Sequence, residues 1–133
     1  NWERLEDNGL PSSFGFPIAI NHLKPDMAFV IPEDSVRGSE GEVGGGDRVT
    51  TGGRLGVYCT EDGGQSWELA TSGLPERAWV EVLREGMASD RHDPVGIYFG
   101  TKSGSVFVSP DEGGEWIEAA RHLPAVLSVE VSE

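Results

Sequence analysis

The stretch Thr60-Glu61-Asp62-Gly63-Gly64-Gln65-Ser66-Trp67 returns 49 residues later as Ser109-Pro110-Asp111-Glu112-Gly113-Gly114-Glu115-Trp116. Both copies follow the pattern Ser/Thr-x-Asp-x-Gly-x-x-Trp. The aspartate can accept backbone N–H groups across a tight turn, and the glycine permits a positive φ. The tryptophan starts the next extended segment and covers the turn with a large apolar ring. We therefore expect a turn in each copy whose structural residues are Thr60, Asp62, Gly64 and Trp67, and Ser109, Asp111, Gly113 and Trp116.

The offset of 49 residues holds well beyond these two turns. It carries Val57–Thr60 onto Val106–Ser109, Leu74-Pro75 onto Leu123-Pro124, and Val80–Val82 onto Val129–Val131. A broken third copy opens the chain, because Trp2–Leu5 followed by Gly9-Leu10-Pro11 matches Trp67–Leu69 followed by Gly73–Pro75, with one extra residue. An internal repeat of this length indicates that each copy is one supersecondary unit.

Glycines and prolines separate short apolar runs that are rich in Val, Ile, Tyr and Phe. Short apolar runs bounded by turn residues are typical of β-strands. From the inside outward, the first unit is predicted to contain strands at Ile18–Asn21, Met27–Ile31, Leu55–Thr60 and Trp67–Ala70. The second unit is predicted to contain strands at Trp79–Leu83, Ile97–Gly100, Ser105–Ser109 and Trp116–Ala119. A lone outer strand near Trp2–Leu5 and a lone inner strand near Leu127–Val131 are expected at the two ends.

A four-stranded antiparallel unit of this length is the blade of a β-propeller. The expected fold class is therefore all-β, a propeller segment with two complete blades and two partial ones. Residues 1–11 end a preceding blade, 12–75 form a blade with a long loop at 32–54, 76–124 form the next blade, and 125–133 supply an inner strand of another. Propellers need roughly four to eight blades. Further blades, from a longer chain or from oligomerisation, are therefore expected to close the ring.

The repeated pattern resembles the Asp-box, or BNR, repeat of sialidases and their propeller relatives. More narrowly, Trp79–Glu85 and Gly96–Thr101 look like the C-terminal part of bacterial BNR-repeat proteins that are labelled glycosyl hydrolase or exo-α-sialidase. The resemblance implies a propeller in which the Asp box is structural and lies away from the catalytic centre. For a sialidase it also implies three arginines that grip a carboxylate, a Tyr/Glu nucleophile and an aspartic acid/base. Phe16-Pro17-Ile18 lacks the arginine of the sialidase Arg-Ile-Pro motif, so no sialidase activity is expected from this chain.

Carboxylates alone do not identify a catalytic pair here, because 23 acidic residues guarantee one by composition. The equivalent positions of Asp62 and Asp111 indicate turn residues. Glu81 and Glu130 are predicted in the middle of inner strands, where a carboxylate either lines the central channel or faces water. No catalytic residue is assigned, and the preferred function is a binding or scaffold module for a glycan or a protein. The alternative is part of a propeller glycoside hydrolase whose catalytic residues lie mostly outside this segment.

The composition excludes several classes of partner. Ten Lys and Arg against 23 Asp and Glu give a formal net charge of −13, which repels nucleic acid and anionic membranes at long range. Cys59 is the only cysteine, so no intrachain disulfide can form, and no zinc-type Cys/His spacing or other cofactor motif is present. No apolar run predicts a spanning helix. No secretory signal is visible, and the compartment stays unassigned.

The expected strand order places the repeated aspartate turns on one face of the disc and the other connections on the opposite face. By analogy with other propellers, ligands bind on this second face. The loop at 32–54 exceeds about 12–15 residues, a length typical of functional or disordered loops, and its Gly-rich, acidic composition favours mobility. The basic residues of this face make up the predicted ligand site: Arg48, Arg54, Arg77, Lys102, Arg121 and His122.

Overall fold

The computed structural model describes residues 2–5, 8–12, 14–15, 17–35 and 48–132. Within these residues the fold is all-β, as predicted, with two four-stranded antiparallel sheets and a two-stranded hairpin. The first sheet has the strand order β1-β2-β5-β6. Its strands are β1 (Ile18–Ile20), β2 (Ala28–Val30), β5 (Tyr58–Thr60) and β6 (Glu68–Leu69). All four lie inside the strand ranges predicted for the first unit.

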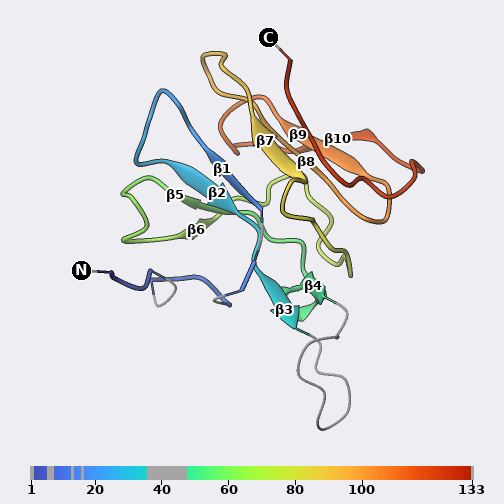
Figure 1. Ribbon diagram of the computed structural model, residues 1–133, viewed down its shortest axis with the longest axis horizontal. Helices are drawn as coiled ribbons and strands as arrows, with labels where there is room; N and C mark the ends of the chain where they lie inside the picture. The colour runs from blue at the N-terminus through green and yellow to red at the C-terminus, as the bar shows by residue number, and fades with distance from the viewer. Residues whose placement is uncertain (1, 6–7, 13, 16, 36–47, 133) are drawn as a thin grey trace, which may run out of the picture.

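The second sheet repeats the first, with the strand order β7-β8-β9-β10. Its strands are β7 (Met87–Ser89), β8 (Ile97–Gly100), β9 (Val106–Ser109) and β10 (Ile117–Ala120). The inner strands β1 and β7 contact each other (Figure 1), and Ser89 Oγ donates to the Ile20 carbonyl oxygen at 2.9 Å. The described residues contain no helix with the length and apolar character needed to span a membrane.

Three predicted strands are wrong. The inner strand of the second sheet is β7, whereas Trp79–Leu83 is an irregular connection. Residues Trp2–Leu5 and Leu127–Val131 are also outside any strand. The repeat explains the error, because Val80–Val82 and Val129–Val131 do correspond to each other, but Val80–Val82 lies in the connection before β7 and Val129–Val131 in the irregular segment after β10.

The inner strands follow a second offset, of 69 residues, that carries Asn21 onto Asp90 and Pro25 onto Pro94. The structure confirms this equivalence at the turn after each inner strand. Asn21 N donates to the Met27 carbonyl oxygen at 3.0 Å, and Asp90 N donates to the Gly96 carbonyl oxygen at 2.9 Å. The offset falls from 69 to 49 because the connection after β2 is longer than its counterpart after β8.

The hydrophobic core lies between the two sheets and draws on both of them. Phe29 of β2 is fully buried, and a Cβ on Gly113 of the second unit would contact its ring. In the second sheet Phe99 stacks on Phe107 and meets Trp116 edge-on, with ring centroids 5.1 Å apart in each pair. Burial of these large rings is the main favourable contribution to the packing of the two units.

The long connection after β2 has an ordered base. β3 (Glu33–Ser35) pairs with β4 (Arg48–Thr50), and a 3₁₀ turn at Thr51–Gly53 follows. Residues 36–47, which contain most of the loop predicted to be mobile, lie outside the described residues. Glu33 is fully buried, and its Oε1 accepts a hydrogen bond from Val82 N at 3.0 Å. The base of this connection therefore anchors the segment that links the two sheets.

Candidate functional site

The turn at Thr60–Trp67 is closed by side-chain hydrogen bonds. Thr60 Oγ1 donates to Asp62 Oδ1 at 2.8 Å and accepts from Gly64 N at 2.8 Å. Asp62 Oδ1 also accepts from Ser66 N at 2.9 Å, and its Oδ2 accepts from Ser66 Oγ at 2.6 Å. These hydrogen bonds, the Ser66 hydroxyl first, lower the pKa of Asp62 to about 2.

The turn at Ser109–Trp116 carries the same contacts. Ser109 Oγ donates to Asp111 Oδ1 at 2.8 Å and accepts from Gly113 N at 2.9 Å. Asp111 Oδ1 accepts from Glu115 N at 2.9 Å, and this bond is the first cause of the lowered pKa of Asp111. Both aspartates are therefore occupied in holding turns.

Acid should destabilise the fold through these two aspartates. Because their pKa values are depressed in the folded state, they contribute stability above the ordinary aspartate pKa of about 4 and lose it as the pH falls through the folded value. We expect the urea midpoint to fall between about pH 4 and pH 2. The double variant Asp62→Asn/Asp111→Asn should show a shallower fall. If the urea midpoint of the double variant fell with pH as steeply as that of the unaltered chain, other carboxylates would be responsible for the acid sensitivity.

Each turn is also tied to the unit before it. Trp116 N donates to the Ser72 carbonyl oxygen at 2.8 Å, and Trp67 N donates to the Asn8 carbonyl oxygen at 3.0 Å. Trp116 Nε1 donates to the Ala70 carbonyl oxygen at 2.9 Å. The repeated tryptophans therefore connect successive units.

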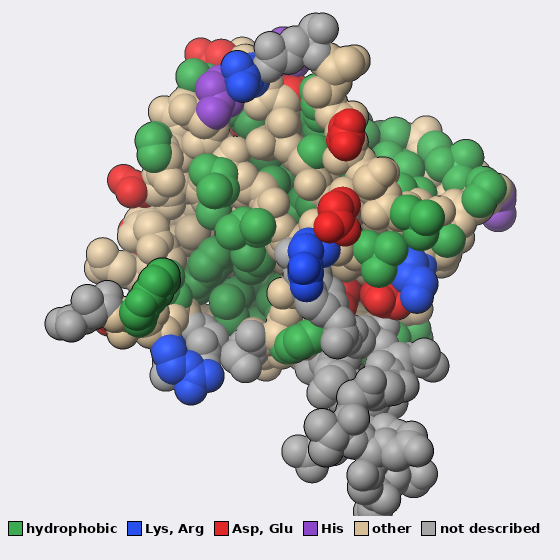
Figure 2. Space-filling view, viewed as in Figure 1, with side chains coloured by type: hydrophobic (Ala, Val, Ile, Leu, Met, Phe, Trp, Pro, Cys, Tyr) green, Lys and Arg blue, Asp and Glu red, His purple; other side chains and the backbone are tan. Residues whose placement is uncertain are grey.

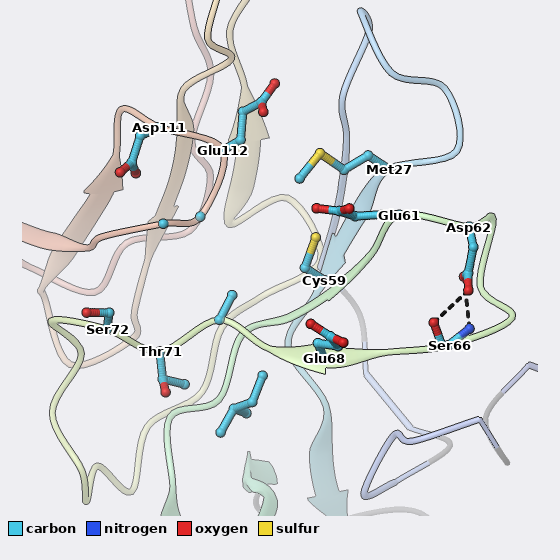
Figure 3. Close-up of a pocket in the computed structure, with 14 residues that line it drawn as sticks. Met27, Cys59, Glu61, Asp62, Ser66, Glu68, Thr71, Ser72, Asp111 and Glu112 are labelled. Atoms are coloured by element: carbon cyan, nitrogen blue, oxygen red, sulfur yellow. Dashed lines mark hydrogen bonds between the residues drawn. The ribbon is translucent and has the colours of Figure 1, made fainter.

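An acidic cleft of about 720 Å³ lies between the first sheet and the second turn (Figure 3). Glu61 and Glu68 line it beside Cys59, whereas the Asp62 carboxylate is turned to Ser66 (Figure 3). Burial raises the pKa of the Cys59 thiol to about 12, so this sulfur is not an activated nucleophile. Glu112 is held by Lys24, which lowers the pKa of Glu112.

A second cleft, of about 950 Å³, lies on the face of the long connection. We call it the arginine cleft, because Arg54 and Arg77 both line it, together with Tyr58, Thr51 and Glu76. Among the described residues, no hydrogen bond or ion pair engages either guanidinium group. Burial raises the pKa of the Tyr58 hydroxyl, which keeps the phenol protonated as a hydrogen-bond donor.

The structure brings together only part of the predicted ligand site. Lys102 Nζ donates to Glu81 Oε2 at 2.7 Å and is therefore already paired. Arg121 and His122 are exposed on the connection after β10 and do not line the arginine cleft. Arg48 begins β4, but its side chain lies outside what the structure describes. Arg54 and Arg77 are thus the two predicted residues that share one cleft.

Glu81 and Glu130 do not occupy inner strands, contrary to the prediction. Both lie in irregular segments, Glu81 before β7 and Glu130 after β10, and Glu81 pairs with Lys102. The predicted placement of these two carboxylates in inner strands is therefore wrong. The 69-residue offset between Asn21 and Asp90 is the sequence signal that places the inner strands correctly.

Sequence reasoning also missed the buried carboxylate of Asp90. It accepts hydrogen bonds from Gly96 N at 2.8 Å and Tyr98 Oη at 2.7 Å, and its Oδ2 lies 3.0 Å from His92 Nδ1. Burial alone raises the pKa of Asp90, but these hydrogen bonds outweigh it and the pKa falls well below the ordinary range. Asn21 holds the equivalent turn in the first unit by accepting from Leu23 N at 2.9 Å. Asp90 is therefore a turn residue of the repeat, and it raises the pKa of His92.

No family model and no curated protein matches the chain. Among solved structures, the fold is similar to the GH74 xyloglucanase from Xanthomonas campestris, with a TM-score of 0.48 and 19% sequence identity. The match covers 77% of this chain and 13% of that chain. The chain thus spans only a small part of that enzyme's length, and its own residues carry the functional argument.

Proposed function

We propose that this chain is a glycan-binding, non-catalytic segment of an Asp-box repeat β-propeller. The observation that carries the proposal is the arginine cleft, where Arg54 and Arg77 lie without side-chain partners among the described residues, beside the Tyr58 hydroxyl. Unpaired guanidinium groups are strong, directional donors. The open cleft also has leucine and proline side chains in its lining, and this mixture of apolar surface and donors suits a sugar chain.

The exposed side of the first unit supports a propeller with further units. In the second sheet Met87, Phe99 and Phe107 are buried in the core to which both units contribute. Their counterparts in the first unit are Ile18, which is 55% exposed, and the half-buried Val30 and Tyr58. Hydrophobic side chains are accordingly visible at the surface (Figure 2). A further unit packed on this face would bury them in the same way, as the proposed ring requires.

A hydrolytic role is the weaker candidate. Glycoside hydrolysis needs two carboxyl groups at a set separation, one of them with a raised pKa. Glu76 is the one carboxylate among the described residues that line the arginine cleft. In the acidic cleft Asp62 and Asp111 are occupied in turns, and Glu61 and Glu68 are exposed. Hydrolysis would therefore need catalytic carboxylates from outside this segment.

The proposal is tested on the purified 133-residue chain with a glycan array and an assay of fluorogenic glycosides, sialosides included. We expect glycan binding without turnover. The double variant Arg54→Ala/Arg77→Ala should lose most of the binding, whereas Arg121→Ala, an exposed arginine outside the cleft, should retain it. Turnover of any glycoside, or full binding by the double variant, would overturn the proposal.

A further inference from the structure

Trp79 presents one face of its indole ring to solvent. The side chain is 70% exposed, and its ring covers Gly53, where an added Cβ would lie 2.6 Å from Cζ2 and 2.7 Å from Cδ2. Gly53 is the neighbour of Gly52, which lines the arginine cleft. The ring is therefore supported from behind by a turn whose other residues line that cleft.

The backbone that carries Trp79 is fixed on both sides of the ring. Ala78 N donates to the Gly53 carbonyl oxygen at 2.9 Å, and Thr50 Oγ1 donates to the Ala78 carbonyl oxygen at 2.7 Å. Thr50 N donates to the Val80 carbonyl oxygen at 3.0 Å. Two residues further on, Val82 N is held by the buried Glu33 carboxylate. A ring held in this way loses little conformational freedom when a ligand binds.

Polar side chains flank the ring along the same extended segment. Ala78 and Val80 pack against the core, while Arg77 and Trp79 are exposed and Glu81 forms its ion pair with Lys102. Along the segment, the exposed ring is thus preceded by a guanidinium that has no side-chain partner among the described residues and followed by an ion pair. It is a single aromatic surface among polar groups, rather than the contiguous apolar centre of a protein–protein interface.

The repeated fold does not require a tryptophan at this position, and an exposed side of a repeated unit does not explain why its ring is exposed. The 49-residue offset carries Trp79 onto Ser128, so the repeated fold does not need an aromatic ring at this position. Trp79 belongs to the connection between β6 and β7, and its ring packs on the turn at Thr51–Gly53 of the same chain. An exposed, supported ring with no structural requirement indicates a ligand contact.

We infer that Trp79 is the stacking platform for a neutral polysaccharide chain. This inference rests on the proposed glycan-binding function and names the class of glycan. The C–H face of a pyranose ring is apolar and matches an open indole face. Its equatorial hydroxyls can form hydrogen bonds, and Arg77 and the Glu81–Lys102 pair supply polar groups on the same segment. The net charge of −13 disfavours a polyanionic chain.

Affinity electrophoresis of the full chain tests the inference, with laminarin and hydroxyethylcellulose as neutral probes and polygalacturonate as the charged one. We expect a neutral probe to retard the chain. Trp79→Ala should weaken that binding by about tenfold or more, and Trp79→Phe should recover part of it. Trp2→Ala is the matched control, because Trp2 is also exposed and no contact among the described residues holds its ring. Circular dichroism checks that each variant is folded.

The remaining outcomes overturn the inference in distinguishable ways. Equal retardation of Trp79→Ala and the unaltered chain would remove Trp79 from the site and leave the proposed glycan binding standing. Retardation by polygalacturonate alone would overturn the neutral class. If no probe retards the chain, the inference fails, while the array and the arginine variants decide the proposed function separately. Binding of a protein in place of all glycans would overturn both.

Discussion

Trp116→Ala is expected to lower the free energy of unfolding by about 3–5 kcal/mol. The side chain is 2% exposed and meets Phe99 edge-on at 5.1 Å. Its removal leaves a cavity between the sheets, since neighbours in a packed core relax only partly. It also leaves the Ala70 carbonyl oxygen without the hydrogen bond that Trp116 Nε1 donates. Urea unfolding followed by circular dichroism measures the effect.

Trp67→Ala shows how much of the stability loss comes from burial of the ring and how much from its position in the repeated turn. Trp67 occupies the same position in the first turn but is only half-buried, so its replacement should cost clearly less. Trp2→Ala, at a fully exposed ring, should change stability by less than about 0.5 kcal/mol. Equal losses of unfolding free energy at Trp67 and Trp116 would show that the place of the tryptophan in the turn, rather than its burial between the sheets, determines its contribution to stability.

Gly73→Ala is expected to cost about 2–5 kcal/mol, the second large effect. Gly73 has a φ of 87°, a conformation that side chains rarely adopt. Its added Cβ would also overlap the carbonyl oxygen of Trp116, which is backbone and cannot rotate away. The link between the two units would have to open to admit the methyl group. Urea unfolding should show a lower midpoint.

Gly52→Ala is the matched control for backbone strain. Gly52 also has a positive φ, of 62°, but an added Cβ there would have nothing within 4 Å. The expected cost is only the conformational one, about 1 kcal/mol. A loss at Gly52 as large as that at Gly73 would contradict the steric explanation and leave φ alone as the cause.

The middle and outer strands were predictable because their signals are local. The turns at Asp62 and Asp111 close through contacts within a few residues, and the spacing of the side chains that make those contacts is visible in the sequence. The alternation of buried and half-buried residues in β2 and β9 follows from the two-residue period of a strand. A regular offset then transferred these assignments from one unit to the other.

The inner strand of the second sheet could not be placed by that offset. Val80–Val82 has the composition of a strand, yet Val82 N bonds to the Glu33 side chain and only isolated backbone bonds join this segment to its neighbours. Composition measures how well a segment fits a sheet, not whether a partner strand lies beside it. The longer connection after β2 changes the spacing between units, and the shared turn at Asn21 and Asp90 is a weaker signal than the repeated tryptophan.

The sequence by itself determined an all-β chain of two repeated four-stranded units, because strand period, turn residues and internal repeats depend on neighbours along the chain. Only the tertiary structure decided which of the candidate site residues lie together. Arg54 and Arg77 line the same cleft. Lys102 forms an ion pair with Glu81. The Trp79 ring packs on Gly53. These contacts join separate elements across the connection between the sheets. They are set by the packing of one unit on another, which no local pattern of residues records.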